Sequence, residues 1–336
     1  MKLFKVKSIE NYSGVSIQQI HNQVKVLRKG YYHVLNIPVG GDAPKDFICV
    51  YKYGEGKKKK IARWPKYIAK VGHKWYPIES VTEYLLNQIG EVLGLRMAKS
   101  ELRVADEQLR FLSKYFLKKD QILVHGAQIF SGYLEENNDD FVTEIETTGL
   151  TRELLTFRVT KRAIELLFPN QSENIVQDFV KMLCFDAITG NNDRHFYNWG
   201  VITDVHGKIQ PHFSPIYDTA RGLFWNFNEE KIDRMYTKGM EVDNIQIKKY
   251  IDNSLPKTGW EGIKKLNHFD LIIKIVTTCP TLADACIALL DDRNLHNILN
   301  LLDIDFKHLF SEKRYSLIEK CLKERFRLLK NICNCN

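Results

Sequence analysis

The sequence lacks any stretch long and apolar enough to cross a membrane, because no run approaches the roughly 18–20 consecutive apolar residues that a spanning helix needs. Its first 14 residues also lack the apolar run of a secretory signal, so export by that route is not predicted. Disorder and fibrous repeats do not fit the composition, since 44% of the 336 residues are hydrophobic and 11% are aromatic. These absences indicate a folded globular chain of one or two domains.

The seven cysteines form no Cys-x-x-Cys pair and no Cys/His grouping with the spacing of a zinc site. Cys184 lies in an apolar helical pattern that predicts a buried position, whereas Cys333 and Cys335 lie at the frayed end of the chain. We therefore expect reduced thiols, as in a cytosolic protein.

The net charge of +8 is confined to one window of the chain. Residues 52–74 hold nine Lys and Arg residues and one acid, so this window carries the whole excess and the remainder is balanced. A dispersed basic bias would favour nucleic acid or a membrane surface as the partner. A concentrated patch needs a local cause, and the four consecutive lysines Lys57 to Lys60 form either a solvated turn or a contact for an acidic partner.

The chain divides into a strand-rich first part and a helix-rich second part. Aromatic and β-branched runs predict strands at residues 31–37, 47–51, 67–71, 101–104 and 109–116. Helical spacing of apolar residues predicts a helix at residues 81–93 that Gly94 closes, and one long helix around residues 175–188.

The boundary between the two parts falls within residues 113–128. Strands followed by helices predict an α+β fold of two lobes in series, with a β-rich N-lobe at residues 1–116 and a mostly helical C-lobe at residues 117–336. Residues 135–146 hold six acids and no base, which predicts a solvated mobile loop.

The most informative stretch follows the long helix and reads Asn-Asn-Asp-Arg-His-Phe-Tyr-Asn at residues 191–198, ahead of a predicted hairpin. Phosphoryl transfer needs one Asp to position or deprotonate the attacking hydroxyl, and an Asn and a second Asp to hold Mg²⁺. Asp193 and Asn198 have the five-residue spacing of a protein-kinase catalytic loop, and Asp218 follows the hairpin where such kinases carry a metal-binding Asp. An isolated Asp and Asn would more simply end a helix, but the complete order favours a catalytic loop.

A kinase also needs a phosphate loop and a lysine upstream of this set. Gly54 and Gly56 lie between two predicted strands and would let the backbone approach phosphates, although the same pattern occurs in plain hairpin turns. Lys70 is embedded in the second strand, whereas Lys66 and Lys74 have the pattern of surface lysines. This placement puts the phosphate loop inside the basic window, so phosphates would account for part of its charge.

An acid on the next predicted helix would fix the lysine in place. Glu83 opens that helix and Glu79 precedes it, and both lie at the margin of its apolar face. We expect Glu83 to be the partner. His195 is expected to hold the catalytic loop through side-chain hydrogen bonds rather than to act in catalysis.

These motifs resemble those of the HipA-like kinases, a family of bacterial Ser/Thr protein kinases that includes persistence toxins and a smaller cell-translocating kinase. The resemblance rests on Asn-Asp-Arg-His-Phe-Tyr-Asn at residues 192–198 and Pro-Ile-Tyr-Asp at residues 215–218. Residues 82–95 also resemble the family's first helix, and residues 112–116 its lobe-connecting strand. In all, the resemblance covers residues 45–230.

The resemblance implies a two-lobed protein-kinase fold, ATP with Mg²⁺, and transfer of phosphate to a Ser or Thr of a protein by a toxin or effector. It implies Asp193 as the base, Asn198 and Asp218 as metal ligands, and Lys70 as the phosphate lysine.

The resemblance also bears on binding and location. Adenine would lie near Ser113, Tyr115 and Phe116, at the connection between the lobes. A protein substrate, an antitoxin partner, and a place in the bacterial cytoplasm or, after delivery, in a host cell would follow from it.

Three departures from the family pattern stand out. Full-length family toxins have more sequence ahead of their glycines, so we expect a short form without their extra N-terminal subdomain. No Ser or Thr lies between Lys52 and Lys66, where family toxins often carry an autophosphorylated Ser, which argues against that self-inhibition. Asp218 is followed by Thr219 and Ala220 instead of Phe-Gly, so the activation-loop behaviour of eukaryotic kinases is not expected.

Two other classes of function compete with this reading. Phosphoinositide-type lipid kinases share the fold and the Asp-Arg-His-x-x-Asn run, but would carry Asp-Phe-Gly after the hairpin. A non-catalytic pseudokinase or nucleic-acid-binding protein would use Lys57 to Lys60, with binding that weakens steeply with salt. No position expected to do chemistry has been lost, so a HipA-like protein kinase without nucleic acid or membrane span is the prediction.

Overall fold

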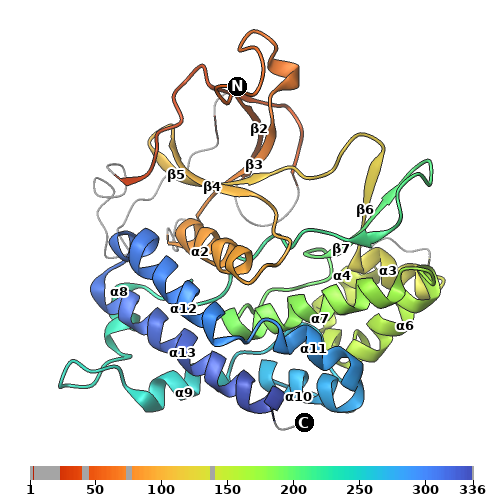
Figure 1. Cartoon of the computed structure of the whole chain (residues 1–336), viewed down its shortest axis with the longest axis vertical. Helices are drawn as coiled ribbons and strands as arrows, with labels where there is room; N and C mark the ends of the chain where they lie inside the picture. Colours follow the sequence, from red (N-terminus) through yellow and green to blue (C-terminus); the bar gives the residue numbers. More distant parts are fainter. Residues whose placement is uncertain (1–2, 4–22, 40–44, 73–77, 137–140, 335–336) are drawn as a thin grey trace.

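The computed structural model of the chain describes residue 3 and residues 23–39, 45–72, 78–136 and 141–334. A five-stranded sheet and one helix form the N-lobe, and a mostly helical part with a small second sheet forms the C-lobe (Figure 1). This arrangement confirms the predicted α+β fold class.

The N-lobe sheet has the strand order β1-β2-β3-β5-β4, and every neighbouring pair is antiparallel. Its strands are β1 (Tyr32–Val34), β2 (Lys45–Val50), β3 (Lys66–Val71), β4 (Ser100–Ala105) and β5 (Gln108–Lys114). All five match predicted strands, because their aromatic and β-branched residues fit a pleated, half-buried surface. The first is shorter than the pattern at residues 31–37 suggests.

The register of this sheet sends its side chains into two different surroundings. Residues directly opposite one another point to the same face, and Lys70 lies opposite Lys45 on β2 and opposite Phe111 on β5. The other face builds a separate apolar cluster, whose members include Ile48, Tyr67, Ala69 and Leu112. Lys70 therefore faces away from this cluster.

One helix, α2 (Glu79–Val92), lies between the N-lobe sheet and the C-lobe helices (Figure 1). Leu85, Leu86 and Ile89 are fully buried at the helical spacing that predicts the element. Gly94 follows the end of the helix with a φ of +72°, a conformation that glycine adopts without the steric cost of a Cβ. The helix thus reaches from the sheet into the main core.

A second, three-stranded antiparallel sheet lies beside the predicted catalytic loop. It consists of β6 (Gln121–His125), β7 (Gly200–Asp204) and β8 (His212–Phe213), in that order. The last two strands are the predicted hairpin, whereas β6 was not predicted, since it is short and only partly buried. The chain passes from the end of β5 at Lys114 to this sheet within a few residues.

The long helix α7 (Ser172–Thr189) runs through the centre of the C-lobe (Figure 1), and 12 of its 18 residues are buried. The predicted burial of Cys184 is confirmed, whereas the expectation of a frayed end at Cys333 is wrong, because that thiol is buried beside Cys286. The other helices are α3 (Gly126–Tyr133), α4 (Phe141–Thr148), α5 (Thr151–Leu154), α6 (Phe157–Leu167), α8 (Glu229–Asp233), α9 (Asn244–Asp252), α10 (His268–Thr278), α11 (Ala283–Ile287), α12 (Asp292–Leu301) and α13 (Glu312–Asn334).

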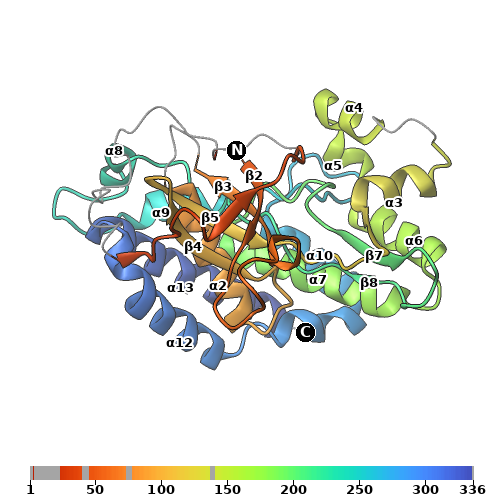
Figure 2. The same cartoon turned by 90° about the horizontal axis from the view of Figure 1, so that it is seen from above.

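The acid-rich segment at residues 135–146 is not the continuous loop that its composition predicts. Residues 137–140 lie outside the described part of the chain, and α4 begins at Phe141. Val142 and Ile145 are buried three residues apart, so a short apolar stripe holds the helix although acids dominate the composition. Figure 2 shows α4 grouped with α3 and α6 at one end of the molecule, away from α8 at the other.

Across the described residues, no single helix has both the length and the apolar character to span a membrane. Taken together, α10 and the segment Pro280–Leu309 meet those criteria, but they are bent by 120° relative to one another.

Candidate active site

The predicted catalytic loop begins where α7 ends. Gly190 follows the helix with a φ of +67°, the left-handed conformation in which glycine commonly stops a helix. A Cβ on Gly190 would lie 2.7 Å from Nη2 of Arg325, which comes from the distant helix α13. The loop that carries Asp193 therefore leaves the helix at a point fixed by tertiary packing.

A buried guanidinium, that of Arg194, holds this loop together. Its Nε and Nη2 donate to the two carboxylate oxygens of Asp186 on α7, each at 2.9 Å. Its Nη1 donates to the backbone oxygen of Asn198 at 3.0 Å and to that of Tyr217 at 2.6 Å. The two residues predicted as metal ligands, Asn198 and Asp218, are thus brought side by side, because the same nitrogen binds the backbone of one and the residue before the other.

Side-chain amides fix the conformation around Asp193. The Nδ2 of Asn198 donates to the backbone oxygen of Asp193 at 2.9 Å, and the Asp193 N–H donates to Oδ1 of Asn191 at 3.2 Å. The Nδ1 of His195 accepts the backbone N–H of Tyr197 at 3.3 Å, which is the loop-holding contact expected of this side chain. The Asp193 carboxylate itself stays partly exposed, so it is accessible from the surface of the site.

The Lys70 ammonium lies between two carboxylates that come from different lobes. Its Nζ is 2.7 Å from Oε1 of Glu83 on α2 and 2.8 Å from Oδ1 of Asp218. Of the two acids considered as its partner, the structure therefore selects Glu83 over Glu79. Of the competing lysines, Lys66 is exposed, and residue 74 lies outside the described part of the chain.

These three charges perturb one another strongly. Burial raises the pKa of Glu83 to about 7, against the opposing charge of Lys70. Burial also acts to raise the pKa of Asp218, but the Lys70 charge outweighs it and holds this pKa at about 2. Burial alone would lower the pKa of Lys70, and the two carboxylates raise it instead. Such perturbed groups, gathered at one place, are typical of functional sites.

The prediction that Gly54 and Gly56 form the phosphate loop is wrong in its geometry. They lie in the connection that leaves β2 at Val50 and enters β3 at Lys66, whereas Lys70 is four residues further along β3, about 13 Å away at strand spacing. Both glycines have positive φ values, +87° and +109°, and serve a tight exposed turn. The connection on the Lys70 side is the one between β1 and β2, of which residues 40–44 lie outside the described part of the chain.

The predicted adenine-contacting residues lie where the chain leaves β5. Ser113 pairs with Ile68 of β3, on the face that carries Lys70. The ring of Tyr115 packs edge-on against Phe47 at 5.3 Å between centroids, and that of Phe116 lies 5.7 Å from the ring of Tyr217. Two aromatic contacts thus flank this segment, one to the N-lobe sheet and one to the residue that precedes Asp218.

The oxygens of Asn198 and Asp218 fit the preference of Mg²⁺ for hard oxygen ligands. Because the Asn198 Nδ2 is engaged by the Asp193 backbone, its Oδ1 is the atom left to meet a cation. Among the described residues, no group of three or more His, Cys, Asp or Glu side chains could hold a metal ion.

Four residues around the candidate site were given no role from the sequence: Asp186, Arg194 as the clamp, Tyr217 and Arg221. Asp186 did carry a signal, because it is an acid within an otherwise apolar, buried run of α7 and therefore required a buried partner. Arg221, whose Nη1 lies 3.2 Å from Oδ2 of Asp193, carried no comparable signal.

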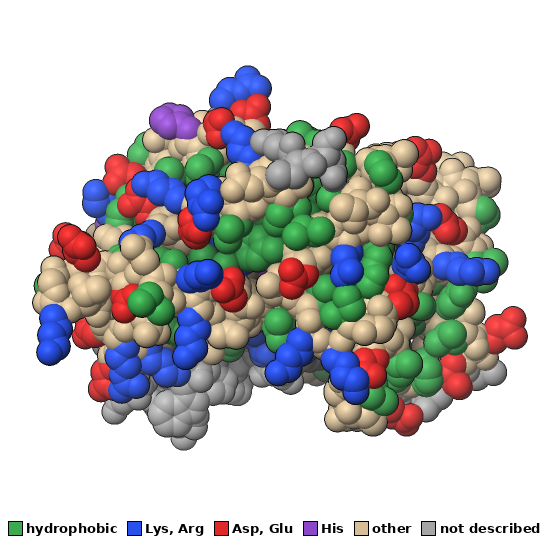
Figure 3. All heavy atoms as spheres, turned by 90° about the horizontal axis from the view of Figure 1, so that it is seen from below, with side chains coloured by type: hydrophobic (Ala, Val, Ile, Leu, Met, Phe, Trp, Pro, Cys, Tyr) green, Lys and Arg blue, Asp and Glu red, His purple; other side chains and the backbone are tan. Residues whose placement is uncertain are grey.

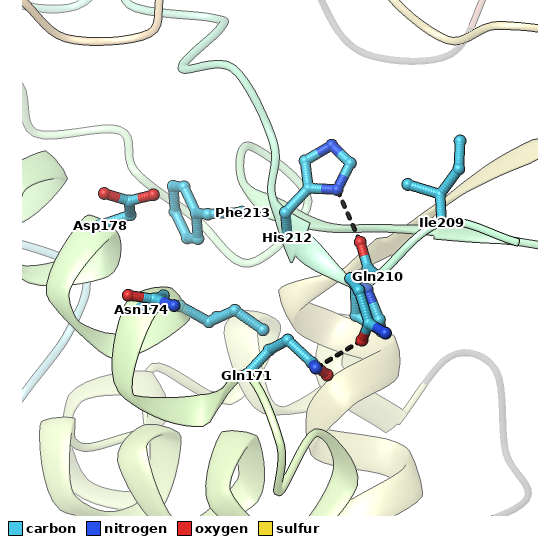
Figure 4. Close-up of a pocket in the computed structure, with 9 residues that line it drawn as sticks. Gln171, Asn174, Asp178, Ile209, Gln210, His212 and Phe213 are labelled. Carbon is cyan, nitrogen blue, oxygen red and sulfur yellow. Dashed lines mark hydrogen bonds between the residues drawn. The ribbon is translucent and has the colours of Figure 1, made fainter. Parts of the chain in front are cut away.

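A separate cavity of about 340 Å³ lies between the start of α7 and strand β8 (Figure 4). Its lining includes Gln171, Asn174, Asp178 and His212. At one edge, the Nε2 of Gln171 donates a hydrogen bond to Oε1 of Gln210. It lies at the opposite end of α7 from the catalytic loop, about 25 Å away along the helix. The cavity is therefore not part of the candidate active site.

Comparison with solved structures defines the class of fold. The structure resembles that of the Helicobacter pylori proinflammatory kinase CtkA with a TM-score of 0.71, over 91% of this chain and 95% of that chain, at 16% sequence identity. The two-lobed fold is thus kinase-like, as predicted. A weaker likeness, with a TM-score of 0.48 and 14% identity, is to HipA of Shewanella oneidensis MR-1, solved with HipB and operator DNA; it covers 80% of this chain and 58% of that chain.

The family follows from the sequence itself. The model of the HipA-like C-terminal domain matches residues 37–270, so the chain belongs to the HipA-like C-terminal domain family. No curated protein sequence matches the chain.

Proposed function

We propose that this chain is an ATP- and Mg²⁺-dependent protein kinase that phosphorylates a Ser or Thr of another protein. The observation that carries the proposal is the contact of Lys70 with both Glu83 and Asp218, next to a loop in which Arg194 ties Asn198 to the segment before Asp218. Membership of the HipA-like family and the kinase-like fold support it.

In this mechanism the chain contributes mainly positioning and charge. Asp193 accepts the hydrogen bond of the attacking hydroxyl and takes its proton, Lys70 binds nucleotide phosphates, and Glu83 keeps the ammonium in place. Asn198 and Asp218 would hold Mg²⁺, which neutralises charge on the phosphates when bound.

Substitution of Asp193 tests the proposal. Because Asp193 acts at the transferring end, Asp193→Asn is expected to lower kcat about 100-fold or more while the affinity for MgATP changes little. Turnover of labelled ATP, autophosphorylation and the thermal shift with MgATP measure this, with Asp178→Asn, a partly exposed residue of α7 outside the candidate site, as the control. A wild-type protein that shows neither ATP turnover, nor autophosphorylation, nor a thermal shift with MgATP contradicts the proposal.

The family supports a further proposal, that the kinase acts as a toxin or effector and has an antitoxin as its protein partner. Growth of cells expressing the wild type or Asp193→Asn, with phosphoproteomics of both, would identify the substrate. A wild type that neither slows growth nor adds phosphosites in cells contradicts the toxin role without touching the kinase chemistry.

A further inference from the structure

The residue that pairs with the catalytic carboxylate comes from the segment after Asp218. The Nη1 of Arg221 lies 3.2 Å from Oδ2 of Asp193. The Arg221 side chain is 36% exposed and that of Asp193 is 21% exposed, so the pair lies at the surface of the site rather than within the core. A substrate that approaches Asp193 would therefore also approach this guanidinium.

The position of Arg221 is fixed from several sides. Its backbone oxygen accepts the N–H of Asn192 at 3.2 Å, which joins the segment to the start of the catalytic loop. The next residue, Gly222, is so close to α7 that a Cβ would lie 2.6 Å from the backbone oxygen of Thr189. The guanidinium lies over the ring of Trp225, 5.2 Å from its centroid. These contacts distinguish the pair from an adventitious surface ion pair.

Two other cations of the site, Arg194 and Lys70, are held by structural partners. Arg194 is next to Asp193 in sequence, but its guanidinium is buried, with only 2% of the side chain exposed. Its N–H groups donate to the Asp186 carboxylate and to two backbone oxygens. Lys70 is bound by Glu83 and Asp218 and serves the nucleotide side. Of these three cations, it is Arg221 whose guanidinium lies beside the Asp193 carboxylate, where charge would develop on the transferring group.

We propose that Arg221 is a catalytic residue whose guanidinium contacts the phosphoryl group during its transfer; this inference rests on the proposed kinase function. In that step the substrate hydroxyl oxygen bonds to the γ-phosphorus, and the bond from this phosphorus to the β,γ-bridging oxygen breaks, leaving its electron pair on ADP. The hydroxyl proton passes to Asp193. As Asp193 loses its negative charge, its hold on Arg221 weakens, and the phosphoryl oxygens become the anionic partner of the planar guanidinium.

Binding of a mimic of the transferring group tests this role separately from turnover. Affinities for Mg·ADP and for Mg·ADP with aluminium fluoride are measured for the wild type, Arg221→Gln, Arg221→Lys and the exposed control Arg234→Gln. We expect Arg221→Gln to lower the preference for the fluoride complex about 100-fold, and kcat with it, because arginines in this role contribute such factors or more. Affinity for Mg·ADP and KM for MgATP should stay within about threefold, as uniform binding is not affected. Arg221→Lys should fall between, and Arg234→Gln should match the wild type.

The outcomes separate this inference from the function on which it rests. If Arg221→Gln keeps the wild-type preference for the fluoride complex, or loses Mg·ADP affinity in equal measure, the role of Arg221 is overturned and the kinase remains. If the wild type itself binds no Mg·ADP and turns over no ATP, the proposed function is overturned, and this inference with it.

Discussion

One buried side chain, Arg194, explains how a short loop can hold several candidate catalytic residues in place. Its planar fork matches the Asp186 carboxylate, and its remaining nitrogen reaches the backbone next to both proposed metal ligands. Motif spacing predicted Asp193, Asn198 and Asp218 because each follows directly from the order of loop and hairpin. It could not reveal that Arg194 points inward, since the same residue in an exposed loop would reach solvent.

Removing the charge of Asp186 should therefore lower the stability of the fold around the site. Asp186→Asn leaves a buried guanidinium without its counter-ion, and we expect the free energy of unfolding to fall by about 3–5 kcal/mol. The matched control is Asp178→Asn on the same helix, whose partly exposed pair with Lys181 is worth less than about 1 kcal/mol. Urea denaturation measures both; equal effects of the two substitutions would contradict the clamp.

Another buried residue, His268, links stability to pH. Burial, with the nearby charge of Arg325, holds its pKa well below the ordinary value, and a contact with the Asn191 backbone and the charge of Arg152 are smaller influences. The folded chain keeps this ring neutral while the unfolded chain binds a proton below pH ~6.5, so stability is full above that pH and falls as the pH decreases.

Between pH 7.5 and pH 5.5, this histidine should cost the wild type about 1 kcal/mol of unfolding free energy that His268→Gln does not lose. Urea denaturation at the two pH values measures the difference, with the exposed His308→Gln as the control. The same pH dependence in the wild type and His268→Gln would refute the assignment.

At the scale of elements, the register of the strands determines which loop lies near Lys70, and the sequence interpretation placed the wrong loop there. All five N-lobe strands and the helix α2 were predictable from local composition and period. The antiparallel register of β2 with β3 places the turn with Gly54 and Gly56 at the Lys66 end of the pair. Lys70 lies at the other end, near the connection between β1 and β2, and the assignment of the glycines missed this difference. The acidic helix α4 was missed for a related reason, because its two buried residues are outnumbered by acids.

The junction between α7 and the catalytic loop offers a test at this scale. Gly190→Ala forces a Cβ into a left-handed conformation, at about 1 kcal/mol, and against the Arg325 guanidinium as well. Gly207→Ala is the matched control, with a φ of +66° and no atom within 4 Å of the added Cβ. We expect Gly190→Ala to lower the unfolding free energy more than the control and to weaken MgATP binding. Similar losses in both variants would show that Arg325 does not constrain this junction.

For the molecule as a whole, the four consecutive lysines of the basic window, Lys57 to Lys60, lie apart from the candidate active site, although the window also contributes Lys70 to that site. The connection between β2 and β3, which holds Lys57 to Lys60, lies at the top of the N-lobe, away from the C-lobe (Figure 1). On the opposite face, seen from below, basic and acidic side chains are interspersed (Figure 3). The charge of these four lysines is therefore not explained by the proposed phosphate site, whereas Lys70 of the same window lies in that site.

Neutralising these lysines should consequently spare the nucleotide site. In a variant with Lys57, Lys58, Lys59 and Lys60 all changed to Ala, the affinity for MgATP is expected to stay within about twofold at moderate salt, because surface charges beyond a Debye length are screened. Lys70→Met provides the contrast and should abolish most MgATP binding. Titration of a fluorescent ATP analogue at two salt concentrations measures both variants; a tenfold loss in the first would contradict the placement.

The Lys70 bridge has a further consequence for how the two lobes meet. The Lys70 side chain comes from the N-lobe sheet, and one of its two carboxylate partners, Asp218, comes from the C-lobe. The two lobes are therefore joined by an ion pair in the absence of nucleotide. Phosphates that bind Lys70 would therefore enter a space whose two sides are already joined by the Lys70–Asp218 ion pair. The conformational entropy of bringing the lobes together is then lost on folding rather than on binding. In the proposed kinase, phosphates that bind Lys70 would take the place of its contact with Asp218, while its contact with Glu83 could remain.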